Sequence, residues 1–205
     1  EIWYFFENQL GASFDMLRIN DISDVFQIVD YDILMLPEGE LTIEFREILE
    51  EWVSEGGQLI VFGSSAENFT DLFQIAIENE EEDLEDDDSE REELSGMITG
   101  AVYSCSIEKN HSLAFGYNSY YTLRQSPVHY TLNSGSPVFT LPKNARQISG
   151  FVGSKVQKEQ SGALIAGQQD FRKGSVTYFI DNPLFRGFWN SGLLMVANAI
   201  YLVNE

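Results

Sequence analysis

The first thirty residues carry short apolar runs whose spacing predicts a helix, a strand and a second helix. Residues 2–10 begin with a strand-like composition, but their apolar positions fall on one helical face, which favours a helix. Residues 13–19 have the pattern of a short strand. Residues 21–26 then predict a short helix, with Asp21 or Ser23 as its N-cap.

The next thirty residues have the pattern of a β–α–β unit. The nearly continuous apolar run 31–36 predicts a strand that is buried on both faces, as in a parallel sheet. Residues 42–55 place apolar side chains at helical spacing, and Gly56 and Gly57 follow them as a stop signal. Residues 58–62 predict a second buried strand. We therefore expect a right-handed parallel crossover between the two strands.

Beyond residue 70 the pattern changes to shorter and more polar segments. Residues 99–108 alternate between apolar and smaller or polar side chains, which predicts a strand with one buried face. Residues 163–167 and 175–180 predict two further strands, and residues 189–202 predict a closing apolar helix. The order of these elements indicates an α/β core that is interrupted by β-rich material.

This organisation predicts a single domain made of several parts. Residues 1–70 and 150–205 form the core, residues 78–95 form an acidic flexible loop, and residues 96–149 form a β-rich insertion. The sequence opens at Glu1 directly on an apolar run, so we expect it to be a fragment of a longer chain.

Composition and charge exclude several classes of function. The chain has 205 residues, and 43% hydrophobic and 13% aromatic side chains are enough to bury a core. The formal net charge is -21, and about half of it comes from residues 78–93. Such a charge repels phosphate backbones and anionic lipid surfaces, so no nucleic-acid partner is expected. The acidic run lacks the EF-hand pattern, which favours a solvated loop over a calcium site. No apolar run reaches the ~20 residues of a membrane span, and no signal peptide is visible.

The turn Gly63–Glu67 is the strongest candidate for catalysis. A glycine and a serine follow a predicted strand, as in a nucleophile elbow, but the second glycine of that motif is Glu67, which would crowd the turn. A nucleophilic serine also needs a base within hydrogen-bond reach, and the only histidines, His111 and His129, lie in the insertion. Ser65 is therefore a weak catalytic candidate, and a capped turn of small residues is the simpler interpretation.

Binding and metal sites have fewer signals. Glu38 follows a predicted strand at the carboxyl end, where open α/β sheets bind ligands, and Ser64 and Ser65 follow the next strand. We take these three as binding candidates, with a solvated loop as the alternative for Glu38. Cys105 lies inside a predicted strand and is expected to be buried and inert. The cysteine and the histidines share no ligand spacing, so no metal site is expected.

Four stretches give the chain a resemblance to a known family. The most specific of them is Asn-Pro-Leu-Phe-Arg-Gly-Phe-Trp, and the others include Tyr-Asp-Ile-Leu-Met-Leu-Pro-Glu-Gly and His-Ser-Leu-Ala-Phe-Gly-Tyr. The stretches lie at residues 1–10, 31–60, 111–117 and 181–189. Through them the chain resembles the class I glutamine amidotransferase-like C-terminal domain of bacterial zinc carboxypeptidase-like (carboxypeptidase A-like) metallopeptidases.

The resemblance implies a three-layer, flavodoxin-like core without an amidotransferase triad. The position of the nucleophilic cysteine falls on Ser65, and the late His-x-Glu motif is replaced near Asp181 and Asn182. It implies no cofactor in these residues and zinc in an upstream peptidase domain, which would be the partner of this one. It also implies a peptide or cell-wall substrate and export to the periplasm or cell surface.

These expectations lead to a non-catalytic accessory or interaction domain of a zinc carboxypeptidase-like peptidase. Asp181 and Arg186 join the binding candidates, because a guanidinium group suits the geometry of a carboxylate. The alternative for Arg186 is a local salt bridge beside core aromatics. Two other functions remain open: an independent serine-type hydrolase that uses Ser65, and a stand-alone module that binds peptide or sugar.

Overall fold

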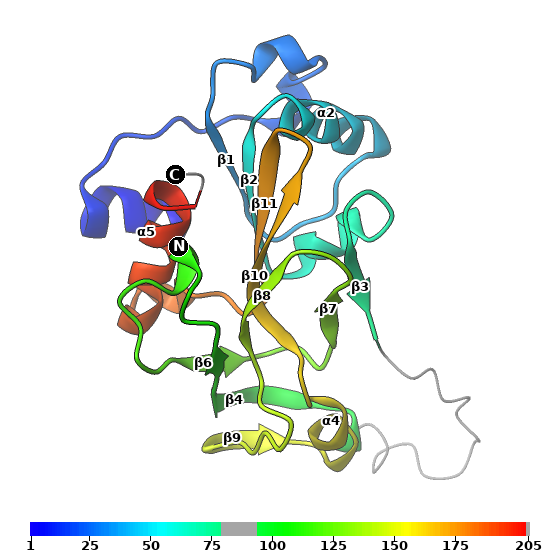
Figure 1. The fold of residues 1–205 in the computed structure, drawn as a ribbon, viewed down its shortest axis with the longest axis vertical. Helices are drawn as coiled ribbons and strands as arrows, with labels where there is room; N and C mark the ends of the chain where they lie inside the picture. Colours follow the sequence, from blue (N-terminus) through cyan, green and yellow to red (C-terminus); the bar gives the residue numbers. More distant parts are fainter. Residues whose placement is uncertain (79–93, 204–205) are drawn as a thin grey trace.

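The computed structural model describes residues 1–78 and 94–203 and builds them around a six-stranded sheet (Figure 1). In spatial order the strands are β1 (Ile33–Leu36), β2 (Gln58–Phe62), β11 (Gly174–Phe179), β10 (Leu164–Phe171), β8 (Ser136–Thr140) and β5 (Ser106–Ile107). The first three are parallel, and the other three pair in antiparallel fashion. The predicted acidic loop lies almost entirely outside the described residues.

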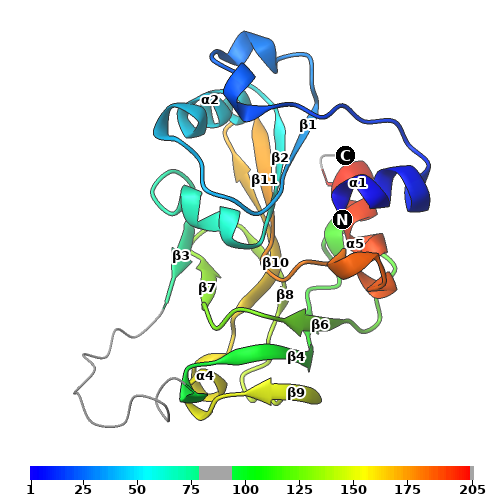
Figure 2. The ribbon, with the colours of Figure 1, turned by 180° about the vertical axis from the view of Figure 1, so that it is seen from behind.

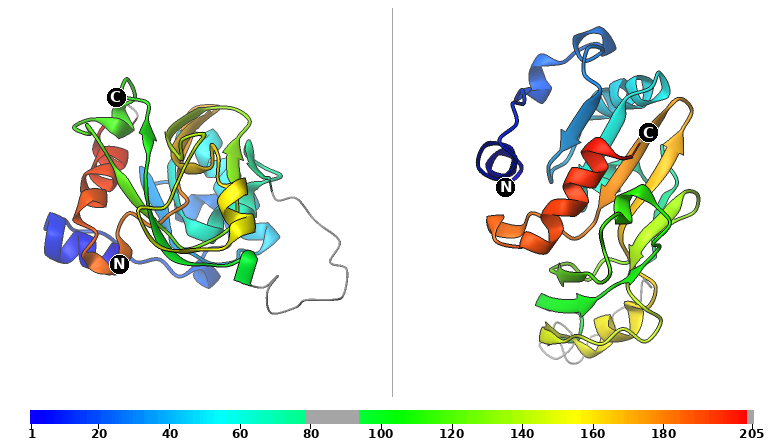
Figure 3. Two further views of the ribbon diagram at one scale, coloured as in Figure 1. Left: turned by 90° about the horizontal axis from the view of Figure 1, so that it is seen from below. Right: turned by 60° about the vertical axis from the view of Figure 1, so that its left-hand side comes forward.

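Helices cover both faces of this sheet, so the expected three-layer, flavodoxin-like α/β arrangement is confirmed (Figures 1 and 3). On one face lies α2 (Ile43–Ser54), which has Thr42 as its N-cap. On the other face lie α1 (Ile2–Tyr4), which continues as the π-helical segment η1 (Phe5–Leu10), and α5 (Leu193–Tyr201).

The alternation of side chains along β2 divides the core into two halves. Leu59 and Val61 pack in the cluster that includes the buried face of α2. Ile60 and Phe62 pack in the cluster on the opposite face, with α1, η1 and α5. Every residue of β2 is buried, as the apolar run in the sequence predicts.

The predicted β-rich insertion over 96–149 is only partly separate from the core, because its strands β5 and β8 belong to the central sheet. Two smaller sheets lie at one end of the molecule (Figure 2). Strands β4 (Ile98–Ser104), β6 (Tyr121–Arg124) and β9 (Ser149–Val152) make a three-stranded sheet, and β3 (Ile75–Ile77) pairs with β7 (Tyr130–Leu132). The short helix α4 (Ser154–Glu159) follows β9. The remaining short helical turns are η2 (Ile19–Asp21), η3 (Val25–Gln27), η4 (Gly63–Phe69), η5 (Ser112–Ala114), η6 (Phe185–Gly187) and η7 (Asn190–Gly192).

The N-terminal predictions are partly wrong. The helix over 2–10 is confirmed, and it ends at Gly11 in the left-handed conformation. The strand predicted over 13–19 is absent, because residues 11–18 run beside the sheet without joining it. The second predicted helix is replaced by η2 and η3, and the cap of η3 is Asp24.

Three later predictions also need correction. β1 is an edge strand, so its first three residues are only half-buried rather than buried on both faces. The strand predicted over 99–108 divides at Cys105, and its two parts, β4 and β5, belong to different sheets. The closing helix begins at Leu193, after the turn η7. The parallel β1–α2–β2 unit, β10 and β11 are confirmed. No helix within residues 1–78 and 94–203 is long and apolar enough to cross a membrane.

The packing of α2 gives a direct test of this core. Leu49 is 1% exposed, whereas Ile43 of the same helix is 62% exposed. We expect Leu49→Ala to lower the free energy of unfolding by about 2–5 kcal/mol, because it leaves a cavity. Ile43→Ala should lower it by less than about 1 kcal/mol. Urea unfolding monitored by circular dichroism measures both, and equal losses would contradict this packing.

Candidate functional site

The carboxyl ends of the three parallel strands meet at one edge of the sheet, which is where the sequence places most of its candidates. Glu38 follows β1, Ser64 and Ser65 follow β2, and Asp181 follows β11. The fold therefore brings these residues to the same region, as in other open α/β sheets. Their side chains nevertheless differ in exposure, since Ser65 and Asp181 are buried while Glu38 and Ser64 are exposed.

The Ser65 hydroxyl is engaged by the main chain. It lies 2.6 Å from the carbonyl oxygen of Pro37 and 3.0 Å from that of Gly39, and the residue is 0% exposed. A hydroxyl has one proton to donate, and here it is hydrogen-bonded to these backbone carbonyls. In a nucleophilic serine the same proton would be hydrogen-bonded to a general base. The hydroxyl instead ties the turn after β1 to the turn after β2.

The first histidine is engaged elsewhere. Nε2 of His111 lies 2.9 Å from Oε1 of Gln168, and Nδ1 accepts a hydrogen bond of 3.1 Å from the backbone N–H of Leu113. Both ring nitrogens of His111 therefore have a partner within the chain. This agrees with the prediction of a satisfied structural histidine. The other, His129, is buried and follows strand β6 by several residues.

The turn after β2 resembles a nucleophile elbow, but the side chains around it differ from those of that motif. Gly63 has φ 55°, and a Cβ there would collide with the side chain of Glu38, which lies over the turn. The prediction that Glu67 crowds the turn is wrong. Its carboxylate instead accepts a hydrogen bond of 2.6 Å from the Tyr130 hydroxyl on β7. Burial and this carboxylate both raise the pKa of Tyr130, so its hydroxyl stays protonated.

A buried ion pair occupies the end of β11. The carboxylate of Asp181 accepts a hydrogen bond of 2.8 Å from the Thr122 hydroxyl, and its other oxygen lies 3.3 Å from Nη1 of Arg124. Burial raises the pKa of Asp181, while the Arg124 guanidinium and the Thr122 hydroxyl oppose this rise. Arg124 is 0% exposed and also donates to the side chain of Gln160 and to the carbonyl of Val128.

Arg124 is the main residue of this region that the sequence did not reveal. It lies on β6, in the insertion, and is 57 residues from Asp181 in the chain. The only signal in the sequence is a charged residue, Arg124, in a strand-like segment, and this does not indicate which residue it pairs with. Because the polar atoms of this pair bond to one another and to Thr122, Gln160 and Val128, the pair holds the insertion against the core rather than offering a free charge.

The loop after β11 holds a carboxylate, but the Arg186 guanidinium does not bind it. The Glu1 carboxylate accepts hydrogen bonds from Asn182 Nδ2, at 2.8 Å, and from the backbone N–H of Arg186, at 2.6 Å. The Arg186 guanidinium is exposed and lies 5.1 Å from the centre of the Phe185 ring. The alternative of core aromatics with a local salt bridge is not found either. Phe188 is 58% exposed, and Arg186 makes no ion pair within the described residues.

Metal-ligating clusters and the cysteine can be assessed within the described residues. No group of three or more His, Cys, Asp or Glu side chains in residues 1–78 and 94–203 could hold a metal ion. Cys105 is half-buried, and burial together with the nearby Asp181 charge raises the pKa of its thiol. It is therefore protonated at neutral pH and is a poor nucleophile.

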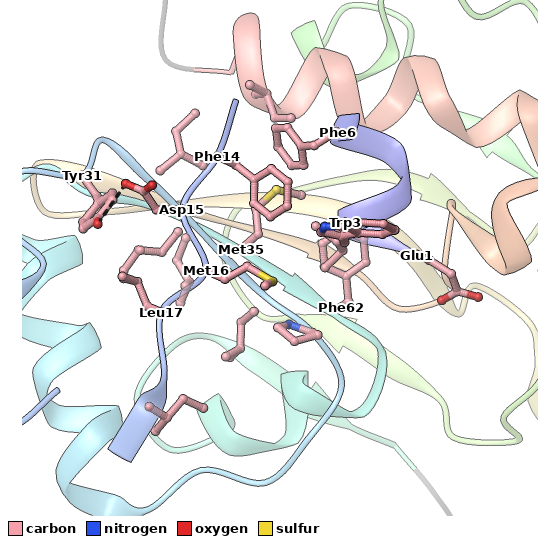
Figure 4. Close-up of a pocket in the computed structure, with 18 of the residues that line it drawn as sticks. Glu1, Trp3, Phe6, Phe14, Asp15, Met16, Leu17, Tyr31, Met35 and Phe62 are labelled. Carbon is pink, nitrogen blue, oxygen red and sulfur yellow. Dashed lines mark hydrogen bonds between the residues drawn. The ribbon is translucent and has the colours of Figure 1, made fainter. Parts of the chain in front are cut away.

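A cavity of about 1110 Å³ lies beside β1, between that strand and residues 13–17 (Figure 4). Its walls are mostly apolar, and Trp3, Met16 and Phe62 converge on it. At its rim the Tyr31 hydroxyl donates a hydrogen bond of 3.2 Å to Asp15. The cavity extends to Glu38 and thus reaches the carboxyl edge of the sheet. Among the binding candidates, only Glu38 lines it.

Comparisons with known proteins identify the fold. No model of a protein family matches this chain, and no curated protein matches its sequence. A cytoplasmic protein from Salmonella typhimurium matches in structure with a TM-score of 0.61 and 10% identity, covering 98% of this chain and 85% of that one. A ThuA-like protein from Bacteroides uniformis matches with a TM-score of 0.58 and 14% identity, covering 97% and 81%. A β-galactosidase from Rahnella sp. matches with a TM-score of 0.52 and 13% identity, covering 92% of this chain and 24% of that chain.

These comparisons correct the expected family. The chain has a ThuA-like, class I glutamine amidotransferase-like fold, as the sequence led us to expect for the architecture. The assignment to a zinc carboxypeptidase-like metallopeptidase is wrong, because the structures that match over most of their own length include two ThuA-like proteins and no peptidase domain. The expected export rested on that assignment and is contradicted as well, since two of the similar structures are described as cytoplasmic proteins.

The buried ion pair can be tested by a double-mutant cycle. We expect Arg124→Met to lower the free energy of unfolding by about 3–5 kcal/mol, because it leaves the Asp181 charge buried and unpaired. Combining it with Asp181→Leu should recover part of that loss. The control is the pair of half-buried Arg46 and exposed Asp71, which lie 2.8 Å apart, and Asp71→Ala should cost less than about 1 kcal/mol. Additive losses for Arg124 and Asp181 in urea unfolding would argue against the pairing.

Proposed function

We propose that this domain is a non-catalytic binding or interaction module. The observation that carries the proposal is the state of Ser65, whose buried hydroxyl is held by the carbonyls of Pro37 and Gly39. At the other catalytic position of the amidotransferase-like fold, Asp181 is paired with Arg124. Both groups therefore stabilise the fold, and neither is placed to attack a substrate or transfer a proton.

The cavity beside β1 supports a binding role. It is larger than the ~300–1,000 Å³ that is common for small-molecule sites, and its walls are mostly apolar with polar groups at the rim. It lies next to the carboxyl edge of the sheet, which is the usual ligand side of this architecture. A domain with this fold can bind without catalysing, because fold and function are separable.

The comparisons are compatible with either a stand-alone or an attached module. The ThuA-like protein is covered over 81% of its length, so the fold makes up most of that chain. In the β-galactosidase the matched part is 24% of the chain, so the same fold there accompanies other parts of a larger protein. An accessory role beside another domain is thus part of the proposal, without any assignment of that domain to a peptidase.

Activity-based labelling tests the absence of serine catalysis. We expect a fluorophosphonate probe to leave both the wild-type chain and Ser65→Ala unlabelled, because the hydroxyl is buried and donates to backbone carbonyls rather than to a base. Labelling of the wild type that disappears in Ser65→Ala would contradict the proposal and support the serine-hydrolase alternative.

The same variant should report the structural role of the hydroxyl. Ser65→Ala removes a buried hydroxyl that donates to the carbonyls of Pro37 and Gly39, so we expect the free energy of unfolding to fall by about 1–2 kcal/mol. Ser64→Ala is the matched control, because the neighbouring serine is exposed and should change stability by less than about 0.5 kcal/mol. Urea unfolding measures both, and unchanged stability in Ser65→Ala would show that the bonds are unimportant.

A further inference from the structure

The sheet of β6, β4 and β9 lies at the end of the molecule opposite α2, and one of its faces is turned to the core (Figure 2). The buried side chains on that inner face include Ala101, Tyr103, Thr122 and Arg124. Because successive side chains of a strand alternate between faces, Val102, Tyr121 and Leu123 point the other way. Phe151 of β9 does the same, since it precedes the buried Val152.

A continuous apolar surface, which we call the outer face, is formed by Val102, Tyr121, Leu123 and Phe151. Val102 lies directly across from Leu123 on β6 and from Ser149 on β9. Leu123 leans over β4, because its Cδ1 lies 4.0 Å from the position that a Cβ on Gly100 would take. None of the four side chains belongs to either core cluster, and Tyr121 and Phe151 are 46% and 47% exposed.

Such a surface is unusual for the solvent side of an antiparallel sheet, which normally carries polar side chains. Strands β4, β6 and β9 contain a single charged residue, Arg124, and it is buried on the inner face. The outer face therefore has no charge of its own to keep it hydrated. A continuous exposed apolar surface of this kind is typical of a protein–protein contact.

The outer face belongs to a basic part of a very acidic chain. Residues 94–169 contain six of the 12 Lys and Arg residues of the chain but only two of its 33 carboxylates, Glu108 and Glu159. Their formal charge is therefore +4, which leaves -25 for the remaining residues. Charge is thus divided unevenly between the outer-face region and the rest of the molecule, and this difference restricts the partner.

Three exposed basic residues gather beside β9, and they are Lys143, Arg146 and Lys158. Arg146 lies just before β9, and Lys158 lies on α4, which follows that strand. Nε2 of Gln157 donates a hydrogen bond of 2.9 Å to Oε1 of Gln147, which holds the segment before β9 against α4. Among the described residues, none of the three basic side chains forms an ion pair. Their charges are therefore available to a partner.

These charges favour an acidic protein over other occupants. Two outer faces placed together would bring two basic groups together, which disfavours a symmetric pair of this chain. A nucleic acid or an anionic membrane would meet no basic side chain on the outer face itself, and its extended charge would be repelled by the rest of the molecule. A few carboxylates on a protein surface act only within about 8 Å at physiological salt, so the nearby basic side chains decide their interaction.

We propose that the outer face is the surface by which this module binds a partner protein, and that the partner presents apolar side chains flanked by carboxylates. The apolar side chains of the partner cover the outer face, and its carboxylates pair with the basic side chains beside β9. This inference rests on the proposed function, since it names the surface and the partner class of the binding module.

A synthetic peptide tests the proposal on the whole chain. The probe is fluorescein-labelled Asp-Glu-Phe-Leu-Trp-Val-Glu-Asp-amide, and fluorescence anisotropy measures its binding. A neutral peptide with Asn and Gln in place of Asp and Glu is the control. We expect the acidic peptide to bind about fivefold more tightly than the neutral one at low salt, and equally at high salt. The net charge of -21 alone predicts the opposite order.

Two exposed phenylalanines provide matched variants for the apolar contact. Phe151 is 47% exposed on the outer face, whereas Phe26 is 80% exposed on η3. Both Phe151→Ser and Phe26→Ser should fold, because neither side chain belongs to a core cluster. We expect Phe151→Ser to weaken the binding of both peptides by about tenfold and Phe26→Ser to leave it unchanged.

Two exposed arginines provide matched variants for the charge. Arg146 lies beside β9, and Arg18 lies outside the basic region, so Arg146→Glu and Arg18→Glu change the net charge equally. We expect Arg146→Glu to weaken the acidic peptide by about fivefold and to leave the neutral peptide unchanged. Arg18→Glu should change the binding of either peptide by less than about twofold.

Several results would overturn the outer-face site. They are no binding up to millimolar peptide, equal or tighter binding of the neutral peptide at low salt, and equal effects of the paired variants. A dimer in sedimentation that Phe151→Ser dissolves would replace the partner protein by a second copy. Competition by a DNA oligonucleotide would replace it by a nucleic acid, and competition by a peptide of residues 79–93 would replace it by the acidic run of this chain. If peptide binding fails and the fluorophosphonate probe still does not react, the non-catalytic role stands and only the outer-face site is lost.

Discussion

The ion pair between Arg124 and Asp181 is the interaction on which the arrangement of this molecule depends. It joins β6 of the insertion to the end of β11 in the central sheet, across 57 residues of sequence. Both side chains are buried, so each charge needs the other, and the Gln160 and Val128 oxygens complete the guanidinium shell. The ion pair consequently holds the insertion in one position at the carboxyl edge of the sheet. The region where this fold commonly binds ligands therefore connects two parts of the structure instead.

The same edge shows how a catalytic architecture can serve a structural purpose. The Ser65 hydroxyl closes the gap between two turns, and Glu67 anchors Tyr130 of the insertion. The Ser65 hydroxyl and the Asp181 carboxylate, which a hydrolase would keep free for catalysis, are both bonded to neighbours in this chain. The apolar cavity next to β1 is the open space in this region.

The sequence predicts the parts of this fold that are locally determined. The β1–α2–β2 unit follows from continuous apolar strands, a capped amphipathic helix and glycine stops, and all of these signals agree with one another. The position of Ser65 follows from the same unit. The Arg124 pair could not be predicted, because it depends on how two distant segments meet in space. The peptidase resemblance failed for a related reason, since stretches such as residues 31–60 reflect the architecture, which many proteins share.

The wrong prediction over 13–19 points to a physical compromise at the edge of the sheet. Its apolar residues resemble a strand, yet they face a cavity and leave the backbone of β1 unpaired. Free strand edges invite aggregation, and proteins usually shorten, cover or charge them. The far edge, β5, is only two residues long, while the β1 edge is screened by residues 13–17 and ringed by carboxylates. The carboxylates near β1 would repel the same edge of a second copy, so charge protects this edge from pairing between like chains.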